Sequence, residues 1–248
     1  YCYLTTERIE YACKLHSYHS GTNYADEFER LNSKRGEQMK YLGKPAGMWA
    51  LFAGSFEKHL TVEFDLTAEQ AKDVAARAKK KYREIIAKLP EFDKRDRFEM
   101  NIVNCAMLAA FILCMPQRPD LKTLTDYYAA AMMTPTMKAF CRASGKKKFT
   151  PKDIEGMKAT AKLRAGDRNP YSWNMDFFEY EDGNGYEARF TTCGICTLMQ
   201  VLGLYDLTPA LCHLDYTMSD AGGASDFVRE YTLASGGPYC DCGYHKKQ

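Results

Sequence analysis

The chain has 248 residues, of which 46% are hydrophobic and 27% are charged, so it can bury a substantial core without metals or disulfides. Lysine and arginine total 34 against 32 aspartates and glutamates, and a formal net charge of +2 supplies no strong field for capturing a nucleic acid. The longest apolar run, residues 105–115, is far shorter than the roughly 20 residues that span a bilayer, so neither a nucleic-acid partner nor a membrane span is expected.

The first two-thirds of the chain is predicted to be helical. Thr67 and Gln70 form a capping box, and good helix formers continue from there to Leu89, where Pro90 stops them. A second helix is expected over residues 96–115. Its second half is apolar on all sides, which is typical of a helix at the centre of a bundle.

Two prolines divide the rest of the helical portion. Residues 121–143 have a helical pattern that Pro135 should break. Pro151 opens the next helix, with Thr150 as its N-cap. The basic loop between them, residues 146–148, is expected to be solvated rather than functional.

From about residue 170 the pattern changes to short aromatic strands and further helices. The elements expected here are strand, strand, helix, helix, strand and strand, over residues 176–180, 186–192, 193–202, 208–222, 227–234 and 239–244. The first two strands flank a Gly and Asn turn and form a hairpin, and Thr208 is expected to cap the second helix. This order predicts an α+β fold, in which a mainly helical portion (residues 1–168) precedes an antiparallel sheet unit with helices on one face (residues 169–248). Without a visible linker, the whole chain, 1–248, is expected to be a single domain.

Nine of the ten cysteines fall into two groups, and Cys2 is uninformative. Four lie in apolar helical patterns, where free cysteine packs as a small hydrophobe, at Cys13, Cys105, Cys114 and Cys141. Five lie in the predicted sheet unit, at Cys193, Cys196, Cys212, Cys240 and Cys242. Disulfide frameworks belong mainly to short secreted chains, and no signal-peptide pattern is visible, so we expect free thiols in a reducing cytoplasm.

The second group contains a CxxC pair, Cys193 and Cys196, at a strand-to-helix junction. A helix N-terminus lowers a thiol pKa, which places Cys193 to act as a nucleophile or a ligand. Alternation along the last strand puts Cys240 and Cys242 on one face, with Asp241 opposite. Together these four thiols resemble a zinc site, so structural zinc stays open beside a redox disulfide and a catalytic role.

Several charged or polar residues of the sheet unit could serve the same site. Cys212 and Asp215 are three residues apart on a predicted helix and share a face, whereas His213 points about 100° away. The pair can reach one pocket, or it can be a buried cysteine beside an aspartate that bonds the backbone. Arg189 and Arg229 could each hold a substrate carboxylate, or could pair with a neighbouring glutamate.

Two further features are ambiguous. Trp173 belongs to an aromatic segment that either lines the pocket or packs in the core. His16 and His19 have the spacing of a metal pair but lack a third ligand, so we expect surface histidines.

Five segments of the sheet unit carry a resemblance to a known family. They read Arg189-Phe-Thr-Thr-Cys193, Gly203-Leu, Leu207-Thr-Pro-Ala-Leu-Cys212-His-Leu-Asp215-Tyr, Arg229-Glu-Tyr-Thr232-Leu and Gly237-Pro-Tyr-Cys240-Asp241. This series resembles the L-2-amino-thiazoline-4-carboxylic acid hydrolase family of bacteria. More distantly, the order of elements is similar to that of the vinyl-reductase-like domains, which are α+β small-molecule-binding modules.

The resemblance implies hydrolytic opening of a cyclic amidine, from 2-amino-thiazoline-4-carboxylate to N-carbamoyl-cysteine, in cysteine metabolism. The recurrent positions of the family fall on Cys193, Cys212, Asp215, Cys240 and Asp241. This chain departs from the family pattern in two places. Cys242 replaces the usual aromatic residue, and Cys196 is an additional thiol.

Ring opening requires attack on the amidine carbon, a carboxylate to stabilise the amidinium, a proton for the leaving sulfur and a grip on the ring carboxylate. The residues assigned to these steps are, in turn, Cys193 or Cys240, Asp215, His213 or Asp241, and Arg189 or Arg229. The expected partner is a small-molecule substrate, with no cofactor and with a homodimer as an open option. Two alternatives remain, a non-catalytic small-molecule-binding module and a zinc-stabilised domain.

Overall fold

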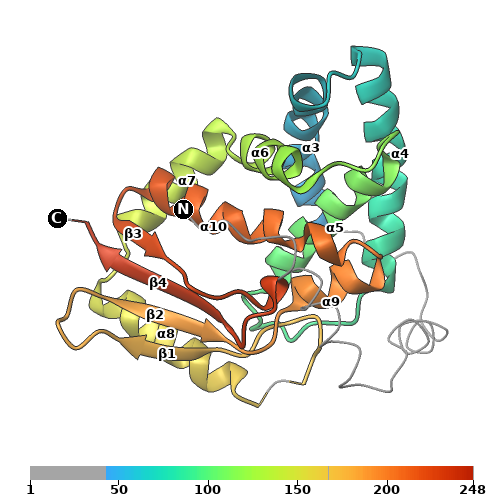
Figure 1. Ribbon diagram of the computed structural model, residues 1–248. Coiled ribbons are helices and arrows are strands. Elements are labelled where there is room, and N and C mark those ends of the chain that lie inside the picture. Colours follow the sequence, from blue (N-terminus) through green and yellow to red (C-terminus); the bar gives the residue numbers. More distant parts are fainter. Residues whose placement is uncertain (1–42, 167, 248) are drawn as a thin grey trace.

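The computed structural model describes residues 43–166 and 168–247, so the predictions for Cys13, His16 and His19 lie outside the described residues. Helices make up the first part and an antiparallel sheet follows, which confirms the predicted α+β class (Figure 1). The helices of the first part are α3 (Lys44–Glu63), α4 (Ala68–Lys88), α5 (Glu99–Cys114), α6 (Leu121–Met132), α7 (Pro135–Gly145) and α8 (Pro151–Arg164). No helix in these ranges or in the rest of the described chain has the length and apolar character needed to cross a membrane.

The helix boundaries follow the local signals of the sequence. Thr67 and Gln70 form the predicted capping box at the start of α4. The chain breaks at Pro135, where the hydroxyl of Thr134 accepts a hydrogen bond from a backbone N–H of the first turn of α7. Thr150 caps α8 in the same way.

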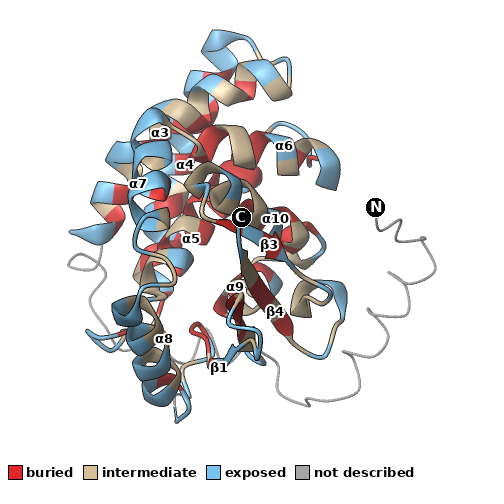
Figure 2. Ribbon diagram, turned by 90° about the vertical axis from the view of Figure 1, so that its left-hand side faces the viewer, coloured by how far each residue is buried: buried red, intermediate tan, exposed pale blue. Residues whose placement is uncertain are grey.

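Helix α5 is the centre of the helical layer. Every residue of its second half except Leu113 is buried, close to what the sequence predicted, and the rings of Trp49 and Phe56 from α3 pack against Phe111. Phe56 lies 5.1 Å from Phe111 and 5.6 Å from Tyr127 between ring centroids. Figure 2 shows that α8, in contrast, is largely exposed. The larger hydrophobic core therefore lies around α5, and α8 is not part of it.

The C-terminal part has the predicted order of strands and helices. Its elements are β1 (Asp176–Glu179), β2 (Gly185–Phe190), α9 (Gly194–Val201), the 3₁₀ turn η1 (Tyr205–Leu207), α10 (Thr208–Gly222), β3 (Ser225–Val228), the 3₁₀ turn η2 (Leu233–Ser235) and β4 (Cys240–Lys246). The sheet order is β1-β2-β4-β3, and each neighbouring pair is antiparallel.

The sheet has an inner, covered face and an outer face. In the register, Ala188 of β2 pairs with Cys242 of β4, and both side chains are buried. Met157 of α8 and Tyr216 of α10 pack against this apolar cluster, so both helices cover the inner face. Because side chains alternate along a strand, Arg189 belongs to the outer face.

Two sequence predictions need correction. The strand expected over residues 227–234 ends at Val228, because the N–H groups of Glu230 and Tyr231 donate to the Asp241 side chain instead of to a sheet partner. Thr208 is not an N-cap. It is the first residue of α10 and is buried, and its hydroxyl has no hydrogen-bond partner in the part of the chain that the structure describes.

One glycine is required where α9 begins. A Cβ atom on Gly194 would lie 2.1 Å from the carbonyl oxygen of Tyr171 and 2.9 Å from Ile102. Only glycine allows this close approach of backbone to backbone. The start of α9 is thereby fixed against both the core helix α5 and the segment before β1.

Candidate active site

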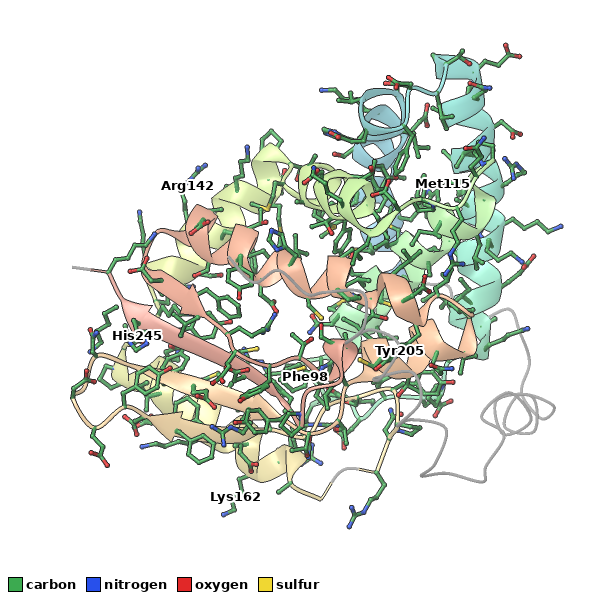
Figure 3. The ribbon with its side chains drawn as sticks, in the orientation of Figure 1. Phe98, Met115, Arg142, Lys162, Tyr205 and His245 are labelled. Atoms are coloured by element: carbon green, nitrogen blue, oxygen red, sulfur yellow. The ribbon has the colours of Figure 1, made fainter. Side chains whose placement is uncertain are left out.

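Four thiols of the C-terminal part converge where α9, α10 and β4 meet. We call Cys193, Cys196, Cys212 and Cys240 the thiol cluster. Negative charge on Cys193 raises the pKa of both Cys212 and Cys240. Charge on any of these three cysteines raises the pKa of Cys196. Sulfur atoms gather between these elements in Figure 3, close to the labelled Tyr205. Residues that the sequence places in three separate segments thus form one group.

Cys193 is the N-cap residue of α9, as predicted, and its pKa is lowered. The largest cause is a hydrogen bond from the thiol of Cys196, followed by the backbone N–H groups of Cys196 and Ile195 and the side chain of Trp173. These donors stabilise a thiolate at the start of the helix. Cys193 therefore differs from the other described cysteines with a resolved pKa shift, since the pKa of each of those is raised.

The other thiols of this region remain protonated. The hydrogen bond to Cys193, together with burial, raises the pKa of Cys196. Burial raises the pKa of Cys212 well above its usual value, that of Cys240 to about 11 and that of Cys242 to about 12. One thiolate is thus surrounded by thiols that can donate protons.

Arg229 connects α10 to β4. Its guanidinium donates to the Asp215 carboxylate at 2.6 Å, to the Cys212 carbonyl oxygen at 2.9 Å, to the Asp241 carbonyl oxygen at 3.1 Å and to the Cys242 sulfur at 2.8 Å. The Arg229 side chain is 7% exposed, whereas that of Asp215 is 43% exposed. Arg229 is therefore a positioning residue, and it holds an accessible carboxylate beside the cluster.

Asp241 lies on the face of β4 opposite Cys240 and Cys242, as the strand alternation predicted. Its two carboxylate oxygens accept hydrogen bonds from the backbone N–H groups of Tyr231 and Glu230, at 2.6 and 2.7 Å. Asp241 holds the loop after β3, and with it the backbone of Arg229, rather than facing the thiols.

Arg189 and His213 also lie apart from the cluster. Arg189 donates to Glu187 at 2.8 Å and stacks on Tyr239, with 4.2 Å from the guanidinium carbon to the ring centroid. This is the glutamate pairing that the sequence left open. His213 is exposed and stacks on Tyr216 at 5.5 Å.

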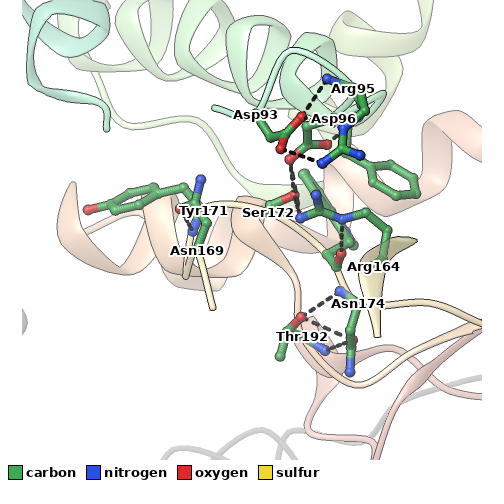
Figure 4. A network of polar contacts seen from close by, with 11 residues as sticks. Asp93, Arg95, Asp96, Arg164, Asn169, Tyr171, Ser172, Asn174 and Thr192 are labelled. Atoms are coloured by element: carbon green, nitrogen blue, oxygen red, sulfur yellow. Dashed lines mark hydrogen bonds and ion pairs between the residues drawn. The ribbon is translucent and has the colours of Figure 1, made fainter. Parts of the chain in front are cut away.

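Trp173 is buried, and its side chain forms a hydrogen bond with Cys193. Arg164 donates to the Trp173 carbonyl oxygen at 2.9 Å, and it pairs with Asp96 at 3.2 Å (Figure 4). Ser172 completes this network with a 2.5 Å hydrogen bond to Asp96. Because the ion pair is almost fully buried, it fixes the backbone that presents the Trp173 indole to Cys193.

Sequence reasoning missed two tyrosines of the site. Tyr205 forms a side-chain hydrogen bond with Cys196, and its hydroxyl donates to the Leu233 carbonyl oxygen at 3.0 Å. Tyr128 lies within electrostatic reach of Cys212 and Asp215, both of which raise its pKa further after burial. Tyr128 occurs in an ordinary helical pattern and Tyr205 in the short connection between two predicted helices, so no local signal marks either residue.

The basic loop before α8 is only partly solvated. Lys146 and Lys147 are exposed, as predicted, but Lys148 is half-buried. Its Nζ atom lies 3.2 Å from the centroid of the Tyr244 ring, and burial lowers the pKa of the amine to about 8. The prediction of a solvated loop is therefore wrong for Lys148, because the loop folds back onto the sheet.

The arrangement does not resemble a metal centre. Among residues 43–166 and 168–247, no three His, Cys, Asp or Glu side chains have the geometry to hold a metal ion. Two of the four cysteines in the zinc alternative have partners outside that set, since Cys240 accepts from the Leu233 N–H and Cys242 from Arg229.

The structure also has a surface hollow of about 300 Å³ far from the thiols. Glu69, Asp73 and Arg77 of α4 line it, together with Pro116. None of the predicted site residues belongs to this hollow.

The fold and the site define an α+β protein in which a cysteine of lowered pKa at a helix start lies near thiols of raised pKa and a carboxylate. A family model described as L-2-amino-thiazoline-4-carboxylic acid hydrolase matches residues 100–244, which is more than half of the chain. The chain belongs to this family. The match begins in α5 and ends in β4, so it includes every residue that was predicted for the site. No curated protein and no solved structure matches the chain.

Proposed function

We propose that this protein hydrolyses a cyclic amidine, with 2-amino-thiazoline-4-carboxylate as substrate and N-carbamoyl-cysteine as product. Membership of the family supports a hydrolase of this class. The observation that carries the proposal is the convergence of Cys193, at the start of α9, with Cys212, Cys240 and the accessible carboxylate of Asp215. We place the reaction in a reducing compartment such as the cytoplasm, where these thiols stay free.

The chemistry follows from one nucleophilic thiolate. Cys193 attacks the amidine carbon, and the bond from that carbon to the ring sulfur breaks. The ring sulfur takes a proton and leaves as a thiol, and the substrate remains bound to Cys193 as an isothiourea. One water then attacks the same carbon and releases the urea product with regeneration of the Cys193 thiolate. The sum is one substrate and one water to one N-carbamoyl-cysteine.

The protonated thiols supply the proton for the leaving sulfur. Cys196 contacts Cys193 directly, and its raised pKa keeps it protonated. Tyr205, which is hydrogen-bonded to Cys196, extends this chain of donors. In this proposal the proton transfer therefore comes from within the thiol cluster, rather than from His213 or Asp241 as first considered.

Asp215 is the group that binds the amidine. Protonation of the substrate gives a planar amidinium, which pairs with a carboxylate in the way that a guanidinium does. The Asp215 oxygen that Arg229 does not hold remains available for this contact. Arg229 keeps the carboxylate on the side of α10 that carries Cys212.

The first test is turnover of 2-amino-thiazoline-4-carboxylate, measured as release of free thiol. We expect Cys193→Ser to reduce kcat by about 1,000-fold or more, because the nucleophile is removed. Cys141→Ser is the matched control, since Cys141 is a buried cysteine of α7 outside the cluster. Mass spectrometry of rapidly quenched wild-type enzyme should find the isothiourea on Cys193.

Full activity in a folded Cys193→Ser variant would overturn the assignment of Cys193 as the nucleophile. Tight binding of the thiazoline without any turnover in the wild type would favour the non-catalytic binding module instead.

A further inference from the structure

The proposed reaction lacks one element, a group for the ring carboxylate of the substrate. Sequence reasoning assigned this task to Arg189 or Arg229. Arg189 is paired with Glu187 and belongs to the outer face of the sheet, and Arg229 donates to four acceptors within the protein. Neither guanidinium is available for a bidentate contact with substrate.

Lys148 is a cation with no carboxylate partner among the described ion pairs. Its Nζ atom lies over the Tyr244 ring at 3.2 Å, with the Tyr186 centroid at 5.5 Å. The nearest acidic group on α8, Asp153, already accepts from the Phe149 N–H at 2.9 Å and from the Tyr186 hydroxyl at 3.1 Å. A half-buried ammonium that contacts aromatic rings, with Asp153 and Asp215 within electrostatic reach but in no described ion pair with it, is poised to take an anion.

Lys148 is also on the correct face of the sheet. Tyr244, which its amine contacts, is on the same inner face as Cys240 and Cys242 because side chains alternate along β4. Negative charge on Cys242 or Asp215 raises the pKa of Lys148. Negative charge on Asp215 also raises the pKa of Cys212 and Cys240. Asp215 thus lies within electrostatic reach of both the thiol cluster and the ammonium.

We propose that Lys148 is the specificity residue that binds the carboxylate of the substrate. With the amidine at Asp215, the carboxylate on the opposite side of a five-membered ring faces Lys148. The inference rests on the proposed function for the identity of the substrate, but its core claim is that the site selects cyclic amidines that carry a carboxylate.

Binding measurements separate this claim from the claim of catalysis. Calorimetry compares two probes, 2-amino-thiazoline-4-carboxylate and 2-amino-thiazoline, which lacks the carboxylate. We expect Lys148→Met to weaken binding of the first by about 10- to 100-fold, the range for loss of a charge-assisted contact, and to leave binding of the second unchanged. Lys148→Arg should retain most of the affinity. Lys147→Met, an exposed neighbour in the same loop, is the control and should change neither.

In kinetics the same loss should appear mainly in KM for the carboxylate substrate, with kcat little changed, because Lys148 touches no reacting atom. A merely structural role would instead weaken both probes equally. Equal effects on the two probes, or unchanged binding of the carboxylate probe, would overturn the inference. If selective binding is present but no probe is turned over, the proposed hydrolase activity fails and the Lys148 inference stands.

The pH dependence gives a second readout. The pKa of Lys148 is lowered to about 8, so the charged amine is lost as pH rises through that value. The preference for the carboxylate probe over 2-amino-thiazoline should therefore fall above about pH 8 in the wild type and persist to higher pH in Lys148→Arg. The charged or titratable groups that face Lys148 are Asp153, Asp215, Tyr186, Cys242 and Tyr244. A preference that is independent of pH up to 10 in the wild type would contradict the assignment.

Discussion

The helical layer and the sheet unit both contain buried cysteines, but the surroundings lower a thiol pKa only in the sheet unit, among the cysteines that the structure describes. Cys105, Cys114 and Cys141 lie in α5 and α7, and burial raises the pKa of each. Cys193 is also largely enclosed, yet its pKa is lowered, because it stands at a helix start with N–H, S–H and indole donors directed at it. The comparison shows that burial makes a thiol inert unless the surrounding donors compensate for the lost water.

Alkylation with iodoacetamide should reveal the largest difference between the two groups. Only a thiolate reacts, and the pKa of Cys193 lies below its usual value, whereas that of Cys240 is about 11. At pH 7.5 we expect Cys193 to react about 100-fold or more faster than Cys240, Cys114 or Cys141. Peptide mapping after brief labelling measures the rates.

The rate at Cys193 should increase at lower pH than the rates at the other cysteines, and the rate at Cys240 should still be rising at pH 9. Equal labelling of Cys193 and Cys141 in folded protein would remove the distinction between the two groups.

The buried ion pair behind Trp173 connects the two regions, so its loss should be the next largest effect. Asp96→Asn removes the carboxylate from an almost fully buried ion pair with Arg164, and we expect a loss of about 3–5 kcal/mol in the free energy of unfolding. Urea denaturation measures this loss. Asp93→Asn is the matched control, since Asp93 pairs with Arg95 on the surface, and we expect a change below about 1 kcal/mol.

The same Asp96→Asn variant, which keeps the volume of the side chain, also tests whether the ion pair with Arg164 supports the site. If Asp96→Asn folds, its Cys193 should be alkylated more slowly than in the wild type, because the indole of Trp173 is no longer held against the sulfur. Unchanged stability together with an unchanged rate would mean that the network supports neither region.

The smallest effect is expected for a packing cysteine. Cys141→Ala removes a sulfur atom from the contact between α7 and α10, which should lower the free energy of unfolding by about 1 kcal/mol and leave turnover unchanged. Urea denaturation and the thiol-release assay measure the two quantities. A large loss of turnover would assign Cys141 to the site and erase the division between the groups.

The local signals of the sequence were sufficient for the elements and for the place of Cys193 at the start of a helix. The caps at Thr67 and Thr150 and the break at Pro135 are confirmed, as is the order of strands and helices. These features depend on hydrogen bonds and backbone angles within a few residues. Thr208 was misassigned because η1 supplies a preceding turn that the cap-plus-proline pattern does not reveal.

The roles of the charged residues could not be obtained in this way. Arg189 and Arg229 look equivalent in the sequence, but the register puts Arg189 on the outer face, whereas Arg229 joins Asp215 and Cys242 on the inner side. Lys148 looks like one member of a solvated basic run. Its contact with Tyr244 depends on a loop folding across the sheet, between residues far apart in the chain.

The sequence by itself determined the α+β class, the start of a helix at Cys193, the shared face of Cys212 and Asp215, and the family. Tertiary structure alone decided which thiol carries the charge, which arginine positions the carboxylate and which cation is left for an anion. The physical reason is the separation along the chain of the groups that interact. Helix starts and strand faces are set by neighbours along the chain, whereas ion pairing and pKa shifts are set by whatever groups lie close in space.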